Sequence, residues 1–531
     1  MHHTLQIQEI VLNIFRYCHP LTQMSGTSSL PALARACRAF NGPALDVLWK
    51  ELSDPSPLAQ CVPGAYHHSD ANRTYSFTRA LVQGEWRVLR SYARRVRSIL
   101  DFNHGLDWES VQAFLPTTLA DPLLPNLRHL HATEISISTF TRMLAAPIPF
   151  RSLISLDVSV VGANNLEVLE LFIGLFAEFS PNIRELSVRL RQHGVRSMLH
   201  PGTRFRIQFA SHICRWEHLK SVDCGDIPLE ADTLAHLSRM PTLTLLSCAP
   251  SATLTLHDSV TPICFSNLLA LRLQSASLVT VSLFLPRVRL PATVALRAFI
   301  EERFSKRDLH SFMASVQTCI RSVNIQELRL KEAKKYDYRD TSVLYFEDMQ
   351  PYMAFSDLRR IDINISWFVG LTDNDLLQLA SAWPHLEELL INENSGWCAS
   401  GITPDGLVKL LRRSGSLRKI ALAIDTRRFT TFNEAKASLG LTLPPKLSLN
   451  VLDSRIDDDT VPSMATLLAC IASDSDLSLQ AFRMEADPDQ CARWHDAFQR
   501  AKDALGQGYI PFTEIDFPRH RCYRFPRQLV N

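Results

Sequence analysis

Glycine is scarce in this sequence. The chain has 531 residues, of which 18 are glycine, about half of the usual ~7%. Glycine-rich loops that cradle phosphates, and the chemistry that depends on them, are therefore disfavoured. The sequence also lacks the GxxxxGK[ST], GxSxG and HExxH motifs and a GxGxxG following a strand. We expect a non-catalytic protein; a hydrolase or transferase site assembled only by the fold stays an alternative.

Long apolar runs and an excess of one charge are also missing. The best candidate for a membrane span, Val168–Phe176, contains Glu170 and falls short of the ~20 apolar residues that a span needs. Lysine and arginine number 56 against 54 aspartates and glutamates, a net charge of +2. That balance gives no reason to expect a membrane or a nucleic acid as partner. We expect a protein of the cytoplasm, the nucleus or both.

Cysteine and histidine do not cluster as metal ligands do. The 12 cysteines include no CxxC pair, and no cysteine–histidine group has the spacing of a zinc site. Several cysteines, such as Cys224 and Cys248, fall at apolar-periodic positions, where a free thiol packs as a small hydrophobic group. We expect no metal and no other cofactor.

A short pattern, apolar-x-x-apolar-x-apolar, recurs along most of the chain. Copies begin at Leu127, Leu153 and Ile183, for example. From Val96 to Phe512 there are about fifteen copies, with a period of roughly 30 residues. Between copies, apolar residues spaced three and four apart predict amphipathic helices.

One strand and one helix in each repeat predict an α/β solenoid of the leucine-rich-repeat type. Parallel strands would line its concave face and helices its convex face. The alternative, a doubly wound sheet, would need more strands than open sheets normally have and phosphate-binding glycines that are absent here. We therefore expect about fifteen irregular repeats over residues 91–531, preceded by a connector over residues 53–90.

The first 52 residues follow a different pattern. Apolar residues from Leu5 to Phe15 have helical spacing, a second apolar stripe runs from Leu30 to Phe40, and a third short helix follows Asn41-Gly42-Pro43. A unit of about 50 residues is too small to be very stable alone. We expect residues 1–52 to form a three-helix domain that binds a partner or docks on the repeats.

This predicted domain resembles the F-box motif. The residues that carry the resemblance are Ile7-Gln8-Glu9-Ile10 with Ile14-Phe15, Leu33-Ala34 with Ala36-Cys37-Arg38-Ala39-Phe40, and Pro43-Ala44-Leu45 with Leu48-Trp49. Gln8 stands where the F-box normally has a proline. A connector and then leucine-rich repeats follow, and this order resembles that of fungal F-box/leucine-rich-repeat proteins.

The resemblance implies a substrate-recognition subunit of a Skp–cullin–F-box ubiquitin ligase, without catalytic residues of its own. The F-box would bind the Skp-type adaptor, and through it a cullin, while the repeats would bind an unknown target protein. The residues carried over to the adaptor contact are Ile7, Glu9, Ile10, Ile14, Phe15, Leu33, Cys37, Pro43, Leu48 and Trp49. Packing inside the small domain is an equal alternative for each. A second interpretation is a repeat protein that binds or inhibits a partner outside any ligase, with a degenerate F-box as its N-terminal cap.

Side chains between and beside the apolar positions of each strand should face the concave surface. In the middle repeats these side chains are both basic and acidic, so they could bind a charged peptide through charge-assisted hydrogen bonds. The predicted target-binding residues are Arg272, Gln274, Glu327, Arg329, Lys331, Arg360, Asp362, Asn364, Glu388 and Asn392. The alternative for each is a polar residue that meets only water.

Overall fold

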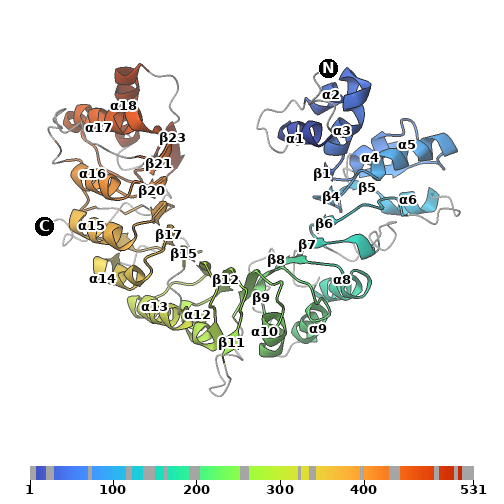
Figure 1. Ribbon diagram of the computed structural model, residues 1–531, viewed down its shortest axis with the longest axis horizontal. Helices are drawn as coiled ribbons and strands as arrows, with labels where there is room; N and C mark the ends of the chain where they lie inside the picture. Colours follow the sequence, from blue (N-terminus) through green and yellow to red (C-terminus); the bar gives the residue numbers. More distant parts are fainter. Residues whose placement is uncertain are drawn as a thin grey trace. The chain divides into compact units, whose positions relative to one another are not determined.

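In the computed structural model, the chain consists of two compact units: unit 1 is Met1–Leu243 and unit 2 is Thr244–Asn531. The structure describes residues 8–18, 29–69, 74–114, 122–135, 141, 150–160, 166–190, 204–250, 262–320, 325–333, 342–394, 396–397, 400–427, 429, 443–483, 489–506 and 512–516. Figure 1 colours these residues along the chain and labels their helices and strands.

Unit 1 begins with three packed helices, α1 (Gln8–Tyr17), α2 (Leu30–Ala36) and α3 (Arg38–Leu48). Cys37 has an extended backbone, which separates α2 from α3. The buried core of these helices consists of Val11, Phe15, Leu30, Ala34, Ala44 and Val47. Three N-terminal helices are therefore present, and their apolar stripes face one another. The predicted break between the second and third helices was wrong: Asn41-Gly42-Pro43 lies inside α3, and the chain breaks at the extended residue Cys37.

A parallel sheet follows in unit 1. Its strands, in spatial order, are β1 (Glu51–Leu52), β4 (Ser98–Ile99), β6 (His129–Ala132), β7 (Ser155–Val160), β8 (Glu185–Leu190) and β9 (Ser221–Pro228). The helices between them are α4 (Ser56–Gln60), α5 (Gln83–Ala93), α6 (Trp108–Phe114), the short η3 (Phe150–Ser152), α8 (Leu166–Phe179) and α9 (Arg204–Ile213), and α10 (Ala231–Ser238) follows β9.

The sheet starts earlier than the sequence pattern indicates. β1 pairs with β4, with Glu51 opposite Ser98, and the carbonyl of Lys50 accepts hydrogen bonds from the amides of Arg97 and Ser98. The expected connector therefore lies inside the first strand–helix–strand unit. It adds a small sheet of β2 (Tyr66–Ser69), β3 (Thr74–Phe77) and β5 (Gly105–Leu106). A two-residue strand such as β1 is too short to display the period-two pattern that marks longer strands.

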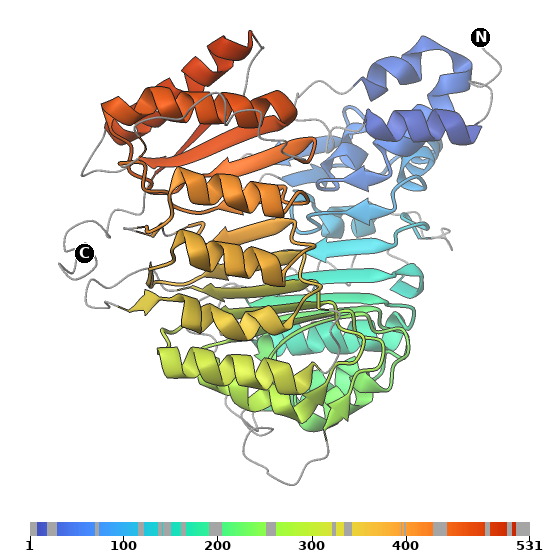
Figure 2. The same ribbon diagram turned by 60° about the vertical axis from the view of Figure 1, so that its left-hand side comes forward.

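Unit 2 is a longer parallel sheet. Its strands, in spatial order, are β10 (Leu245–Ala249), β12 (Ala270–Ser275), β14 (Ala295–Ile300), β15 (Glu327–Glu332), β17 (Arg360–Asn364), β19 (Glu388–Ile391), β20 (Lys419–Ala421), β21 (Lys446–Asn450), β22 (Asp476–Arg483) and β23 (Phe512–Asp516). Two short parallel pairs accompany it, β11 (Ile263–Cys264) with β13 (Val288–Arg289) and β16 (Val343–Leu344) with β18 (Phe368–Val369). Figure 2 shows the strands of this unit stacked side by side.

The helices of unit 2 lie along one side of this sheet (Figure 1). They are α12 (Leu278–Phe284), η6 (Leu285–Arg287), α13 (Lys306–Cys319), α14 (Phe346–Met349), η7 (Gln350–Ala354), α15 (Asp373–Ala382), α16 (Pro404–Arg413), η9 (Asp458–Thr460), α17 (Val461–Asp474) and α18 (Asp489–Leu505). Between helices and sheet lies the core: Phe312 of α13, for example, is fully buried, as is Leu330 of β15. None of the helices described in this unit covers the opposite side of the sheet, which we call the strand face (Figure 1).

Several of these helices have a serine or threonine as N-cap, at the same point of the repeat. Ser305, Thr372 and Thr403 are N-caps of α13, α15 and α16, and each side chain accepts a hydrogen bond from a first-turn amide. The cap of α16 also ties two repeats together, since the amide and hydroxyl of Thr403 each donate to Asp373 of α15 over 2.7 Å. Caps of this kind satisfy amides that have no partner inside the helix.

The repeat found in the sequence is the repeat of the fold. Each copy of the apolar pattern between Val96 and Phe512 coincides with one parallel strand of the two units. Helices that follow the strands bury the apolar stripes expected of them. The architecture is an α/β solenoid, as the strand-plus-helix period predicted.

Candidate functional site

The first candidate surface lies on α1. Ile10 and Ile14 leave 36% and 45% of their surface exposed, and Tyr17 leaves 80%. Residues four and three apart share one side of a helix, so these three side chains form one apolar stripe, which we call the α1 surface. Apolar side chains gathered on an exposed helix face are typical of protein–protein contacts.

The opposite side of α1 holds the three helices together. Phe15 is 3% exposed, and its ring meets that of Phe40 edge to face, with 5.4 Å between the centroids. Of the residues that the F-box resemblance assigned to the adaptor contact, Phe15 is therefore a core residue. Leu33 and Leu48 are half-buried and pack against the same core.

The remaining residues of that predicted contact are placed as follows. Glu9 is exposed on α1, and Cys37 and Pro43 are half-buried on or beside α3. Trp49 stacks on Tyr92 of α5, with 4.7 Å between the ring centroids, so its side chain joins the three helices to the first repeat. Ile7 lies outside the described residues.

A basic hollow of about 580 Å³ lies where the three helices meet the beginning of the sheet. Arg95 pairs there with Asp46 of α3, which ties α3 to the loop that precedes β4. The lining residues are Leu12, Arg16, Asp46, Val47, Lys50, Ser91, Arg94, Arg95 and Arg97. The stacking of Trp49 and this ion pair together fix the helices on the first repeat.

The second candidate surface is the strand face of unit 2. Register places Arg272 of β12 beside Arg297 of β14, and Arg297 beside Arg329 of β15. We call these three residues the arginine row. Neighbouring strands are about 4.8 Å apart, and like charges directly opposite one another are destabilising, so the row needs neighbours that offset its charge.

Glu327 supplies part of the negative charge that offsets the arginine row. Its carboxylate accepts two hydrogen bonds of 2.9 Å from the Arg297 guanidinium and is also paired with Arg329. Burial alone would raise the pKa of Glu327, but the hydrogen bonds and charges of Arg297 and Arg329 outweigh it and hold the pKa below its ordinary value. One carboxylate therefore serves two arginines.

Arg272 is held differently from the other two arginines of the row. Its guanidinium carbon lies 4.5 Å from the centroid of the Phe299 ring, a cation–π contact. In the part of the chain that the structure describes, no carboxylate pairs with Arg272, and its buried Nε has no hydrogen-bond partner. Its charge is thus supported by an aromatic ring and is not neutralised by an acid.

The neighbouring charges on the strand face are paired across strands. Lys331 Nζ lies 2.9 Å from Asp362 Oδ2, and Arg360 Nη1 lies 2.9 Å from Glu388 Oε2. Asp362 is only 1% exposed; it pairs with Lys331, and the register also places it beside Arg329 at the end of the arginine row. These four predicted target-binding residues are brought together as two ion pairs next to the arginine row.

Three other predicted target-binding residues have distinct settings. Gln274 is half-buried and lies beside Phe299 in the register, and Asn364 is buried. Asn392 is fully buried at a backbone φ of +52°. Its side-chain oxygen accepts from the Ile365 amide over 2.9 Å, and its nitrogen donates to the Trp367 carbonyl over 2.8 Å. Asn392 therefore holds the turn after β19 and is not open to a target.

Sequence reasoning did not select Arg297 and Phe299, although both lie within the cluster. The pattern of β14 is weaker than that of its neighbours, because Ala298 stands where a larger apolar residue is usual. Aligning Leu296-Arg297-Ala298 with Leu271-Arg272-Leu273 would have placed Arg297 beside Arg272. Tyr17 was missed in a similar way, since it lies seven residues after Ile10 on the same helix face.

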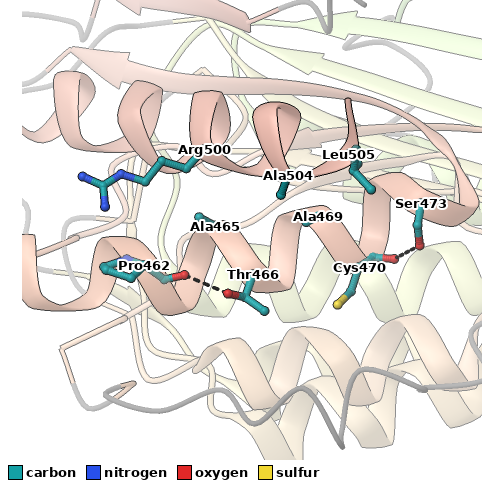
Figure 3. A pocket seen from close by; sticks show the side chains of 9 residues that line it. All are labelled: Pro462, Ala465, Thr466, Ala469, Cys470, Ser473, Arg500, Ala504 and Leu505. Atoms are coloured by element: carbon teal, nitrogen blue, oxygen red, sulfur yellow. Dashed lines mark hydrogen bonds between the residues drawn. The ribbon is translucent and has the colours of Figure 1, made fainter. Parts of the chain in front are cut away.

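A groove between α17 and α18 is shown in Figure 3 and has a volume of about 500 Å³. Small side chains such as Ala465 and Ala469 of α17 line it. Its hydroxyl groups are already bonded to carbonyls of their own helix: Thr466 donates to Pro462 and Ser473 donates to Cys470. Groups that would orient a ligand do not converge there, so the groove is not a candidate site.

The described residues contain neither a membrane-spanning helix nor a cluster of metal-ligating side chains. No helix among them is both long enough and apolar enough to cross a membrane. Within the same residues, no three or more His, Cys, Asp or Glu side chains are grouped so that they could hold a metal ion.

Two solved structures are distantly similar to this chain. No family model matches the sequence, and no curated protein matches it. The leucine-rich repeat-containing protein LegL7 from Legionella pneumophila is 12% identical with a TM-score of 0.31, over 72% of this chain and 99% of its own. In the structure of the Rad7 and Elc1 complex from yeast, the matching chain is 10% identical with a TM-score of 0.29, over 90% of this chain and 88% of its own. Likenesses this weak leave the fold to be judged from the chain's own strands and helices.

Proposed function

We propose that this chain is the substrate-recognition subunit of a Skp–cullin–F-box ubiquitin ligase. The three N-terminal helices bind a Skp-type adaptor, and through it a cullin, while the strand face holds a target protein. The chain itself performs no catalysis and needs no cofactor in this role. It acts in the cytoplasm, the nucleus or both, where such ligases operate.

The observation that carries this proposal is the α1 surface. Ile14 is 45% exposed, beside the exposed Ile10 and Tyr17, in a small helical unit whose core residues pack on the opposite side of α1. An exposed apolar stripe is unfavourable in water unless a partner covers it, because burial of apolar surface is the main driving force of association. The F-box resemblance of this unit supports a Skp-type adaptor as that partner.

The strand face supports the second half of the proposal. Most of its charged side chains are half-buried and form ion pairs with side chains of neighbouring strands. They are therefore held in position before any partner binds. A pre-organised charged surface gives specificity and fast association with a protein of complementary charge. Holding a target for another subunit to modify requires such a surface and no reacting group.

A second candidate is a repeat protein outside any ligase, whose helices only cap the sheet. The contacts between the helices and the first repeat favour it: Trp49 stacks on Tyr92, and Arg95 pairs with Asp46. Terminal caps that cover the open end of the core are a general feature of solenoids. A cap, however, has no use for an exposed apolar stripe on α1.

Capture of a Skp-type adaptor by the purified full chain tests the proposal. The wild-type chain should bind, and Ile14→Asp should weaken binding at least about tenfold, because a carboxylate would be buried without a partner. Leu171→Asp is the matched control, since Leu171 is a 60%-exposed apolar residue of α8, away from α1. Failure of the wild-type chain to bind would exclude the ligase role and leave the capping role.

A further inference from the structure

We propose that the target segment held by the arginine row is an anionic peptide, bound through carboxylate or phosphate groups. This inference rests on the proposed function, because it names the chemistry of the target held by the strand face. It follows from the charge balance, the support of Arg272 and the position of Glu327.

The charge balance of three adjacent strands is strongly positive. The face positions of β12, β14 and β15 carry Arg272, Arg297, Arg329 and Lys331 against the single acid Glu327. Lys331 is offset by Asp362 of the next strand. Four basic side chains thus meet two carboxylates, Glu327 and Asp362, and Asp362 lies beside only the last arginine of the row, which leaves an excess of two positive charges.

Arg272 provides a guanidinium prepared for an anion. The Phe299 ring supports one face of it, and in the described residues no acid occupies it. A planar guanidinium presents paired N–H donors that match the two oxygens of a carboxylate or phosphate. Because the aromatic ring already holds the guanidinium in place, the Arg272 side chain loses less conformational entropy when it binds an anion.

Glu327 shows that the row accepts a carboxylate. Arg297 holds it with two parallel hydrogen bonds of 2.9 Å, the bidentate arrangement that an incoming anion would also use. Glu327 is therefore an internal counter-ion that competes with a bound peptide. Its removal should make the row a stronger anion site, although it removes an ion pair from the fold.

Nucleic acid is the other class of anion that a basic row could meet. Three neighbouring arginines make a short basic surface, and the whole chain has a net charge of only +2. Nucleic-acid binding surfaces usually carry basic residues over a longer stripe or face. An extended peptide with acidic side chains suits the short row better.

The test measures fluorescence anisotropy of labelled peptides with the purified full chain. The probes are a peptide of alternating Glu and Gly, its counterpart with Gln, and its counterpart with phosphoserine. The Glu peptide should bind, the Gln peptide should not, and added salt should weaken binding because the contact is charged. Tighter binding of the phosphoserine peptide would assign phosphate as the source of the anion; equal or weaker binding would assign carboxylate.

Two variants with opposite expected effects distinguish a binding role from a structural one. Arg272→Gln should weaken binding of the Glu peptide about tenfold, the loss expected for one charge-assisted hydrogen-bonded pair. Glu327→Gln should strengthen binding of the Glu peptide, although this substitution does not stabilise the fold. Arg307→Gln is the control, since Arg307 is exposed on α13, the helix side of the sheet.

Two results would overturn the inference even where the Glu peptide binds. One is equal binding of the Glu peptide by Arg272→Gln, Arg307→Gln and the wild type. The other is a single-stranded RNA that binds more tightly than either anionic peptide and depends in the same way on Arg272. Adaptor capture by the wild-type chain, measured in parallel, separates the two proposals. If the chain captures the adaptor but does not bind the Glu peptide, only the anionic target is rejected. If it binds the Glu peptide but does not capture the adaptor, only the ligase role is rejected.

Discussion

Ile14 and Phe15 are neighbours in the chain but belong to different environments. Phe15 is 3% exposed and touches Phe40 across the core of the three helices, whereas Ile14 is 45% exposed on the other side of α1. The rotation of about 100° per residue in a helix separates them. One residue holds the small domain together, and its neighbour stays exposed on the α1 surface.

Phe15→Ala should therefore destabilise the three helices. Loss of a buried phenylalanine typically costs about 3–5 kcal/mol, and a unit this small has little stability to spare. Hydrogen exchange of the amides of α1, α2 and α3 should accelerate, while amides of β12 and β14 should keep their protection. Ile14→Ala should change exchange little, since exposed positions contribute within about 0.5 kcal/mol. Equal acceleration by both substitutions would contradict the assignment of Phe15 to the core.

Glu327 should make stability depend on pH in a defined direction. Its pKa is lower in the folded chain than its ordinary value of 4.5, so the ionised form stabilises the fold above that pH. This stabilisation is lost as the pH falls through the lowered pKa. Glu327→Gln should cost about 1 kcal/mol at neutral pH, and the difference from wild type in urea unfolding should shrink below pH 4.5. A difference that grows on acidification would contradict the ion pairs described for Glu327.

Asn392 should behave as a structural residue. Asn392→Ala removes two buried hydrogen-bond partners and keeps a β-carbon at φ +52° without the polar side chain that supports this conformation, which should lower stability by about 2–4 kcal/mol. Asn392→Gly removes the same hydrogen bonds but tolerates the backbone, so it should be less destabilising by about 1 kcal/mol. Urea unfolding of both variants measures the two contributions. Loss of peptide binding without loss of stability would reverse the assignment.

Cysteine reactivity should follow burial. Burial raises the pKa of the Cys319 thiol to about 12, so at pH 8 it has almost no thiolate to react. Cys264 is exposed and should be alkylated by iodoacetamide much faster. Mass spectrometry of the alkylated peptides gives both rates, and Cys319 should react only after unfolding. Fast labelling of Cys319 in the native chain would show that the core around α13 opens.

The scarcity of glycine has a structural counterpart. Left-handed backbone positions follow several strands, and Glu134, Asn392 and Leu452 occupy three of them, each at φ +52°. At the last position the Asn450 side chain accepts a hydrogen bond from the Leu452 amide. Side-chain hydrogen bonds thus support turns that glycine would otherwise form at lower strain. Low glycine content could be counted in the sequence, but the residues that take its place could not.

From β4 onward, the repeat was visible in the sequence because it depends on local patterns. Leu271 and Leu273 alternate with Arg272, and this period of two determines which side chains enter the core and which lie on the strand face. Helical spacing did the same for Leu309, Phe312 and Val316 of α13. Such periodicity requires no knowledge of which strands are neighbours.

Tertiary structure alone decided which of these residues meet. Glu327 and Arg297 are 30 residues apart in the chain, and loops of irregular length hide the register that joins them. The same holds for the burial of Asn392, which depends on hydrogen bonds to the turn of the preceding repeat. The sequence by itself determined the solenoid and its two faces, because the local spacing of apolar residues decides which side chains are buried. The pairing of charges on the strand face depended on tertiary structure, because only folding places the strands side by side.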